Sequence, residues 1–308
     1  MSKVSIVGSG NVGATAALYI AQGEYAEVTL VDIVEGMPQG KALDLLQTTP
    51  LEAIDCRLAG SNDMAAISGS DVVVVTSGLP RKPGMSRDDL LAKNAEIVGS
   101  VAASIKRYAP NAVVVMVSNP LDVMAYHAMK VTGFPPARVI GMAGVLDSAR
   151  FCAFLATELG VCAGDVMAMV LGGHGDSMVP LTRYASVSGV PVTELLSKEA
   201  LDRIVDRTRN GGAEIVALLK SGSAYYAPGA SVARMAEAII KNKKRLLPAA
   251  AYLSGQYGLD GIFLGVPVIV GRGGVEKIVE LSLLPEERQA LERSAADVRA
   301  TIAKLPPA

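Results

Sequence analysis

Short apolar runs alternate with longer helical patterns over the first 142 residues, and this alternation constrains the fold more than any other feature. Most of the runs are unbroken blocks of β-branched residues, as in "DVVVVT" and "AVVVMV". Strands buried on both faces have this composition, which is typical of parallel sheets covered by helices on both sides. The intervening segments are long enough for right-handed crossovers. We therefore expect an α/β fold with a doubly wound parallel sheet, with strands at 4–7, 27–33, 71–76, 112–117 and 138–142.

The pattern changes after residue 143, which predicts a second domain of mixed α+β type. Residues 165–173 and 186–192 suggest an antiparallel ribbon, and residues 261–271 and 275–281 suggest a strand pair. Helical patterns run over 198–219 and after Pro228, and a last helix is opened by Pro285. We therefore expect two domains, the first at residues 1–143 and the second at residues 144–308.

The composition excludes several classes of protein. Half of the 308 residues are hydrophobic and the net charge is −1, so the chain can build a large core and has no overall attraction to nucleic acid or membranes. Three scattered cysteines argue against a disulfide framework and favour a cytoplasmic protein. The long uncharged run near the start is interrupted by "GSGNVG", so we expect neither a signal peptide nor a transmembrane segment.

The segment "GSGNVG" at 8–13 lies directly between the first predicted strand and the first predicted helix. Its glycines suit a tight turn, a close backbone approach to a pyrophosphate and close helix–strand packing, and the helix N-terminus offers N–H groups to phosphates. Asp32 follows Gly13 by 19 residues and can accept hydrogen bonds from ribose hydroxyls. Because Asp32 would repel a 2′-phosphate, the pattern favours NAD over NADP. The alternative is a glycine turn that serves only the fold.

Several polar residues stand in small or apolar surroundings. His174 in "LGGHGDSMVP" has little bulk beside it, whereas His127 in "LDVMAYHAMKV" reads as a structural residue. Asp147 and Arg150 share a helix face at i, i+3, as catalytic groups or as a plain surface ion pair. Asn119 ends a buried strand before Pro120, either at a ligand site or as a turn starter. Two histidines are too few for the usual metal centres, so no metal is expected.

The loop "GLPRKPGMSR" at 78–87 carries Arg81, Lys82 and Arg87 between a buried strand and a helix. No packing requirement explains this charge, and the glycines and prolines of the loop are consistent with a lid that closes over an anion. The alternative is a set of solvated loop charges.

As a set, these motifs resemble the lactate/malate dehydrogenase superfamily, most closely its lactate-dehydrogenase-like malate dehydrogenases. The resemblance covers the whole chain through "GSGNVG", "VVTSGLPRKPGMSRDDLL", "VSNPLDV", "GVLDSARF", "GGHGDSMVPL" and "GSAYYAPGAS". It implies that His174 is the catalytic acid/base and that Asp147 is its carboxylate partner. It also implies that Arg150 binds the substrate C1 carboxylate, that Arg87 polarises the reacting carbonyl, and that Asn119 contacts substrate oxygen and cofactor.

The resemblance further implies that Arg81, where lactate enzymes typically have glutamine, binds the distal carboxylate of malate or oxaloacetate. Sealing that charge over a methyl group would cost about 3–5 kcal/mol, or roughly 10²- to 10³-fold in discrimination. It implies NAD as cofactor, a place in the tricarboxylic acid cycle, a homo-oligomer (tetramer or dimer) and a cis bond at Asn119–Pro120. The expected cofactor contacts are Gly8, Ser9, Gly10, Asn11, Val12, Gly13, Asp32, Asn94, Val117, Ser118 and Asn119.

Two other interpretations remain open at this stage. One is an L-lactate or other 2-hydroxy-acid dehydrogenase, against which Arg81 argues, because a bulky apolar keto acid would favour a neutral loop. The other is a non-catalytic dinucleotide-binding protein, which would need the glycine loop and Asp32 but would have no use for His174 and Asp147.

Overall fold

The computed structural model describes residues 2–79 and 87–306, except for the side chain of Arg87. Its strands are β1 (Lys3–Val7), β2 (Glu27–Val31), β3 (Leu58–Ser61), β4 (Val72–Val75), β5 (Val113–Met116), β6 (Val139–Gly141), β7 (Val166–Met167), β8 (Val170–Leu171), β9 (Val179–Pro180), β10 (Ser186–Val187), β11 (Val190–Pro191), β12 (Arg245–Ser254), β13 (Asp260–Gly271) and β14 (Gly274–Ile278). Its α-helices are α1 (Asn11–Gln22), α2 (Met37–Glu52), α3 (Arg87–Tyr108), α4 (Leu121–Thr132), α5 (Gly144–Leu159), α6 (Val192–Leu195), α7 (Lys198–Leu219), α8 (Tyr226–Ile240) and α9 (Pro285–Ile302).

A single nine-stranded sheet with the order β14-β13-β12-β6-β5-β4-β1-β2-β3 organises the molecule. The six strands from β3 to β6 are parallel, in register such as Val4 opposite both Val28 and Val72. The chain order reverses between β1 and β4. In sheets of this kind the carboxyl ends of the strands at that point form the ligand-binding crevice. The predicted doubly wound parallel sheet is therefore confirmed.

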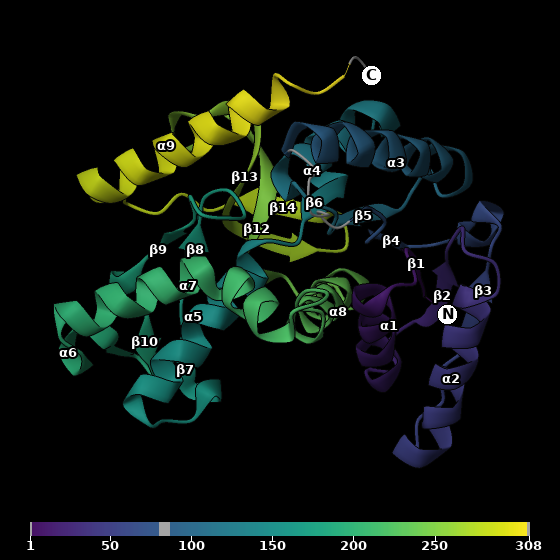
Figure 1. Cartoon of the computed structure of the whole chain (residues 1–308), viewed down its shortest axis with the longest axis horizontal. Coiled ribbons are helices and arrows are strands. Elements are labelled where there is room, and N and C mark those ends of the chain that lie inside the picture. Colours follow the sequence, from purple (N-terminus) through teal and green to yellow (C-terminus); the bar gives the residue numbers. More distant parts are fainter. Residues whose placement is uncertain (1, 80–86, 307–308) are drawn as a thin grey trace.

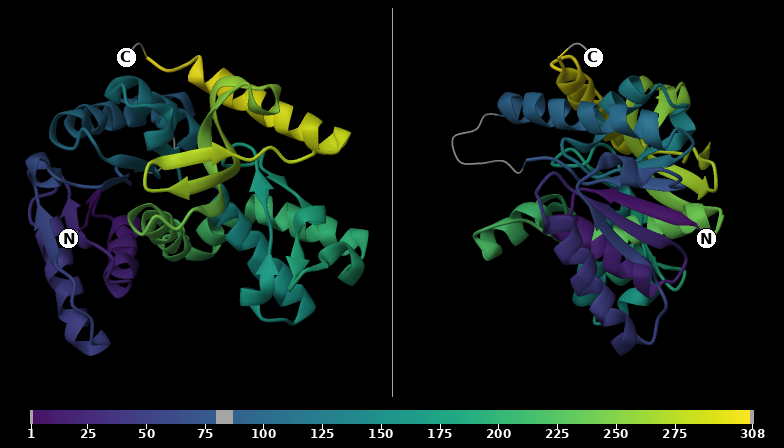
Figure 2. Two further views of the ribbon diagram at one scale, coloured as in Figure 1. Left: turned by 180° about the vertical axis from the view of Figure 1, so that it is seen from behind. Right: turned by 90° about the vertical axis from the view of Figure 1, so that its right-hand side faces the viewer.

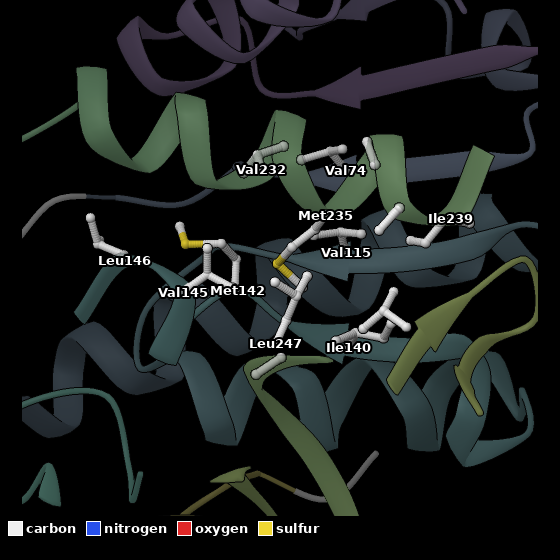
Figure 3. Close-up of a cluster of buried hydrophobic side chains, with 14 of the residues drawn as sticks. Val74, Val115, Ile140, Met142, Val145, Leu146, Val232, Met235, Ile239 and Leu247 are labelled. Carbon is white, nitrogen blue, oxygen red and sulfur yellow. The ribbon is translucent and has the colours of Figure 1, made fainter. Parts of the chain in front are cut away.

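Helices cover both faces of the sheet, and the valines of β4 show why its sequence is uniformly apolar. Val72 and Val74 point into a core shared with α1 and α8, and Val73 and Val75 point into a second core under α3 and α4. Figure 1 shows α3, α4 and α9 on one side of the sheet and α1, α5 and α8 on the other. Figure 3 shows Met235 of α8 lying among side chains of the sheet, including Leu247 of β12.

The predicted strands of the first half lie within two residues of the observed ones, whereas β3 and β12 were missed. β3 reads "LAGS", which has neither alternation nor a β-branched block, and it lies at the edge of the sheet. β12 reads "RLLPAAAYLS", where proline and three alanines argue locally against a strand. Its pairing with β13 along ten residues overrides that weak propensity.

The second half extends the sheet instead of forming a wholly separate layer. β12 joins antiparallel to β6 where Ala250 lies opposite Gly141, and β13 and β14 follow. The remaining short strands form a three-stranded and a two-stranded sheet. Figure 2 shows this region, around residues 160–210, at the opposite end of the molecule from α2. No helix in the described ranges is long and apolar enough to cross a membrane.

Two details of the prediction for the second half need correction. Residues 165–173 are not one strand but β7 and β8, which pair with β10 and β9 respectively, because the chain changes partner around Ala168 and Met169. The helix placed after Pro228 begins at Tyr226, so that Pro228 occupies its first turn, where a missing N–H costs no helical hydrogen bond. The pair β13–β14 and the bounds of α7 agree with the prediction.

Adjacent leucines on β12 provide a test of this packing. Leu247 is 3% exposed and Leu246 is 50% exposed. We expect Leu247→Ala to lower the free energy of unfolding by about 2–5 kcal/mol, because it leaves a cavity between β12 and α8. Leu246→Ala, the matched control, should change it by less than about 1 kcal/mol. Urea unfolding at fixed protein concentration measures both, and equal losses would contradict the burial described.

Candidate active site

The glycine loop joins β1 to α1 at the carboxyl edge of the sheet. Gly8 has φ +109°, and a Cβ at Gly13 would lie 2.0 Å from the Gly8 carbonyl oxygen, so the turn and the close packing both require glycine. A Cβ at Gly10 would meet nothing within 4 Å. Gly10 precedes α1 without a capping side chain, which leaves first-turn N–H groups available to a ligand. The loop therefore fits a dinucleotide pyrophosphate.

Asp32 directly follows β2, and its carboxylate is held in place by main-chain donors. Oδ2 accepts from the Ser9 N–H at 2.7 Å and Oδ1 accepts from the Val34 N–H at 3.0 Å. Each oxygen keeps a lone pair that a ribose hydroxyl can use. The Ser9 hydroxyl is buried without a hydrogen-bond partner in the described part of the chain, which is consistent with a ligand nearby.

Beyond β5, Val117, Ser118 and Asn119 cross the same edge of the sheet, and the Asn119–Pro120 peptide bond is cis, as expected. The Ser118 hydroxyl donates to the carbonyl oxygen of Ser77 and so ties the segments after β5 and β4 together. The side chain of Asn119 is exposed at the edge. It is placed to contact a ligand that lies over the strand ends.

Asn94 on α3 is 1% exposed, and its amide is occupied by main-chain groups. Its Oδ1 accepts from the Leu79 N–H at 2.8 Å, and its Nδ2 donates to the carbonyl oxygens of Leu79 and Asn119 at 3.3 and 2.8 Å. Asn94 therefore links Leu79, near the start of the loop at 78–87, to Asn119 in the segment after β5. The contact with cofactor expected for Asn94 stays a prediction.

His174 and Asp147 come together from separate elements. Asp147 lies in the first turn of α5, is 2% exposed, and places Oδ2 2.9 Å from Nδ1 of His174, in the loop after β8. Since an ionised carboxylate only accepts, Nδ1–H donates to it, and Nε2 is the end of the ring left to exchange a proton. The imidazole orientation and tautomer are therefore set by a buried acid.

Arg150 lies one turn further along α5, with its side chain 13% exposed. Its Nη1 is 3.4 Å from Asp147 Oδ1, and its buried Nε has no hydrogen-bond partner among the described residues. A Cβ at Gly211 of α7 would lie 3.3 Å from Arg150 Cδ, so glycine makes room for the guanidinium. A buried cation with unused donors is a site for an anion, and a carboxylate matches its planar geometry.

Burial by itself would lower the pKa of His174. The nearby carboxylates of Asp147 and Asp122 outweigh burial and the repulsion from Arg150, so the pKa of His174 is raised above its ordinary value. The imidazole of His174 therefore holds its proton to a higher pH in this site than it would in water.

Sequence reasoning missed two residues that hold the His174 loop. Asp122 of α4 accepts from the His174 N–H at 2.9 Å, and the Ser294 hydroxyl of α9 accepts from the Gly173 N–H at 2.7 Å. The only signal for Asp122 was an acid in an otherwise apolar run, and Ser294 gave none. His127 lies buried on α4 against Gly99 of α3, where burial lowers its pKa, in agreement with its structural assignment.

Two of the predicted residues cannot be placed. Arg81 lies outside the described residues, and so does the side chain of Arg87, although Arg87 is the first residue of α3. Their expected contacts with substrate stay predictions.

Known families match nearly the entire chain. Residues 2–141 match the lactate/malate dehydrogenase NAD binding domain, and residues 144–306 match the lactate/malate dehydrogenase alpha/beta C-terminal domain. The chain belongs to the lactate/malate dehydrogenase family. This membership confirms the resemblance inferred from the sequence motifs, and it is consistent with the dinucleotide cradle at the sheet edge.

The relatives in this family include malate dehydrogenases and lactate dehydrogenases. A malate dehydrogenase of Rhodopirellula baltica is 58% identical over 306 residues, covering 99% of this chain and 97% of the relative. The apo malate dehydrogenase of Picrophilus torridus superposes with a TM-score of 0.96 at 48% identity, over 98% of this chain and 96% of that one. A Cryptosporidium parvum lactate dehydrogenase, complexed with lactic acid and nicotinamide adenine dinucleotide, reaches 0.95 at 45% identity, over 99% of each chain. Fold similarity alone therefore does not separate the two activities.

We expect Asp32→Ala to weaken NADH binding by about 10- to 100-fold, because it removes a charged acceptor for the ribose. It should also reduce the preference for NADH over NADPH, since the repulsion of a 2′-phosphate is lost. Binding titrations by nucleotide fluorescence measure both. Glu35→Ala, an exposed acid three residues on, is the control and should bind like the parent. Unchanged NADH affinity in Asp32→Ala would remove Asp32 from the cofactor site.

Proposed function

We propose that this protein is an NAD-dependent malate dehydrogenase, which interconverts (S)-malate and oxaloacetate by reversible hydride transfer. The observation that carries the proposal is the buried Arg150 guanidinium, whose Nε has no partner in the described part of the chain, next to the His174–Asp147 pair. A carboxylate bound there brings the adjacent carbon of a 2-hydroxy or 2-keto acid toward His174. Relatives named malate dehydrogenase, 53–58% identical over nearly the full length, support malate as the substrate.

In this proposal His174 and Asp147 handle the proton. During malate oxidation, neutral Nε2 accepts the hydroxyl proton while Asp147 stabilises the imidazolium that forms. During oxaloacetate reduction the same imidazolium returns the proton to the developing alkoxide. The raised pKa of His174, caused by the carboxylates that outweigh its burial, suits the reduction direction.

Other residues position the reactants. Arg150 binds the C1 carboxylate through two parallel hydrogen bonds, which fixes the plane of the substrate. Asn119 contacts the substrate oxygen and the cofactor, and Arg87 stabilises negative charge on the carbonyl oxygen, an effect typically worth ~3–4 kcal/mol. The glycine loop (Gly8 to Gly13), Asp32, Asn94 and residues 117–119 hold NAD, which accepts or supplies the hydride when bound.

Selection of the dicarboxylate is assigned to Arg81 from the sequence. Its charge pairs with the distal carboxylate of oxaloacetate, whereas pyruvate has a methyl group there and leaves the charge without a partner. The lactate dehydrogenase reading is disfavoured for this reason. A non-catalytic dinucleotide-binding protein would not need the buried His174–Asp147–Arg150 arrangement.

The proposal includes the setting of the enzyme. Residues 1–143 form the NAD-binding domain and residues 144–308 the substrate-binding domain, a division supported by the two family matches. We assign the enzyme to the cytoplasm as a homo-oligomer, a tetramer or a dimer. The cytoplasmic assignment is supported by the three unpaired cysteines.

The substrate assignment predicts that NADH oxidation with oxaloacetate exceeds that with pyruvate by roughly 10²-fold or more in kcat/KM. Arg81→Gln should shift this ratio toward pyruvate, because the unpaired charge is gone. Initial rates with oxaloacetate, pyruvate and branched keto acids measure the ratio. His174→Asn, the inactive control, should lose turnover and keep NADH binding. Equal efficiencies on oxaloacetate and pyruvate in the parent would refute the selection of a dicarboxylate substrate.

Oxaloacetate reduction requires the imidazolium, so its kcat/KM should fall as pH rises through the raised pKa of His174. Asp147→Asn should move this midpoint to lower pH, because the main carboxylate that stabilises the proton is gone. It should also reduce kcat by about 10²- to 10⁴-fold through loss of the tautomer constraint. Asp202→Asn, an exposed acid on α7, serves as control. A midpoint that does not move in Asp147→Asn would separate Asp147 from proton transfer.

A further inference from the structure

A second buried carboxylate lies next to the catalytic pair. Asp122, the second residue of α4, is 4% exposed, and its Oδ2 accepts from the main-chain N–H of His174 at 2.9 Å. Its other oxygen, Oδ1, is buried without a hydrogen-bond partner in the part of the chain that the structure describes. Such burial of a charged group costs free energy unless another charge compensates it.

The contacts around Asp122 are specific to the loop that carries His174. Gly172 exchanges main-chain hydrogen bonds with Gly265 of β13, and Gly173 donates to the Ser294 hydroxyl. Asp122 accepts a hydrogen bond from the next N–H along the chain, that of His174. Three consecutive residues are thus each held by a different element, and the acceptor at His174 is the only one of the three that ionises.

We propose that Asp122 is a positioning residue for the dehydrogenase reaction, whose carboxylate fixes the main chain at His174 and whose charge favours the imidazolium form of its ring. This inference rests on the proposed function for the role of the imidazolium. The side-chain amide of an asparagine could accept the same hydrogen bond from the His174 N–H. The presence of an aspartate at this buried position therefore needs a further reason. The protonated ring of His174 provides it.

Among the described residues, the groups that face Asp122 and His174 can be named element by element. Asp147 and Arg150 face His174 from α5, α9 presents the uncharged Ser294 and Val298, and β13 presents Gly265. His127, the other histidine of the chain, lies on α4 and faces α3. The first turn of α4 adds a partial positive charge that stabilises an acid at Asp122.

The protonation state of Asp122 decides whether it can stabilise the imidazolium of His174. Burial raises the pKa of Asp122 to about 6, although the hydrogen bond from the His174 N–H and the charge of His174 oppose the increase. Above that pH the anion persists and stabilises the imidazolium. Below it, Asp122 gains a proton and its support for the charge on His174 is lost.

The experiment compares the parent with Asp122→Asn, which keeps an acceptor for the His174 N–H and removes the charge. Because the chain has two histidines, imidazole resonances of the 15N-labelled protein can be followed by NMR through a pH titration, and His174→Asn identifies which set is which. We expect His174 to titrate at lower pH in Asp122→Asn. The pH midpoint of kcat/KM for oxaloacetate should move the same way.

Two matched variants separate charge from geometry. Ser294→Ala removes the neighbouring acceptor, for the Gly173 N–H, and should lower kcat without moving either midpoint. Asp297→Asn removes an exposed acid from α9 and should change neither. Asp122→Ala removes both the charge and the acceptor, and it should lower kcat by about 10- to 100-fold through misplacement of His174. If Asp122→Asn does not fold, Asp122→Ser replaces it in the titration.

An unchanged titration of His174 in Asp122→Asn overturns the proposal, whether or not the parent reduces oxaloacetate. An equal midpoint shift in Ser294→Ala also overturns it, because geometry alone would then explain the effect. If the parent lacks activity on oxaloacetate but the titration shifts as expected, the proposed function fails and the coupling between Asp122 and His174 stands.

Discussion

Buried charge is the constraint on which the site depends. Asp122, Asp147, Arg150 and His174 are largely removed from water, so their charges are stabilised by one another and by main-chain donors. Two of these groups keep an atom without a hydrogen-bond partner among the described residues, Arg150 at Nε and Asp122 at Oδ1. A protein that needed only stability would replace such a cluster with apolar side chains. Among the described residues, the Arg150 Nε without a hydrogen-bond partner is a donor that a bound anion could use.

The sheet provides the geometry that brings this cluster to the cofactor cradle. The parallel strands end at a common edge, which gathers the glycine loop, Asp32 and Asn119. The antiparallel strands β12 and β13 continue the same sheet, and the bridge between Gly172 and Gly265 fixes the His174 loop to it. Hydride and proton chemistry are thus supported by one continuous set of main-chain hydrogen bonds, although their residues come from opposite halves of the chain.

Much of this was predictable from local sequence. The valine block of β4 predicts a strand that is buried on both faces. The spacing between the glycine loop and Asp32 is typical of a dinucleotide site that reaches from pyrophosphate to ribose. β12 was not predictable, since its alanines and proline become a strand only through pairing with β13. The role of Ser294 depends on a contact with Gly173 across 121 residues, which no local pattern encodes. Asp122 could be recognised as an acid in an apolar run, but its hydrogen bond from the His174 N–H could not be predicted.

The same long-range contact has a consequence for how the protein is made. The histidine loop is synthesised well before α9, yet its Gly173 N–H is satisfied only by a hydroxyl of that helix. The dinucleotide cradle needs β1 to β6 and α8, which covers one face of these strands, and all of these precede α9 in the chain. The proton-transfer apparatus has to wait until α9 has left the ribosome. Nucleotide affinity should therefore arise during translation earlier than turnover.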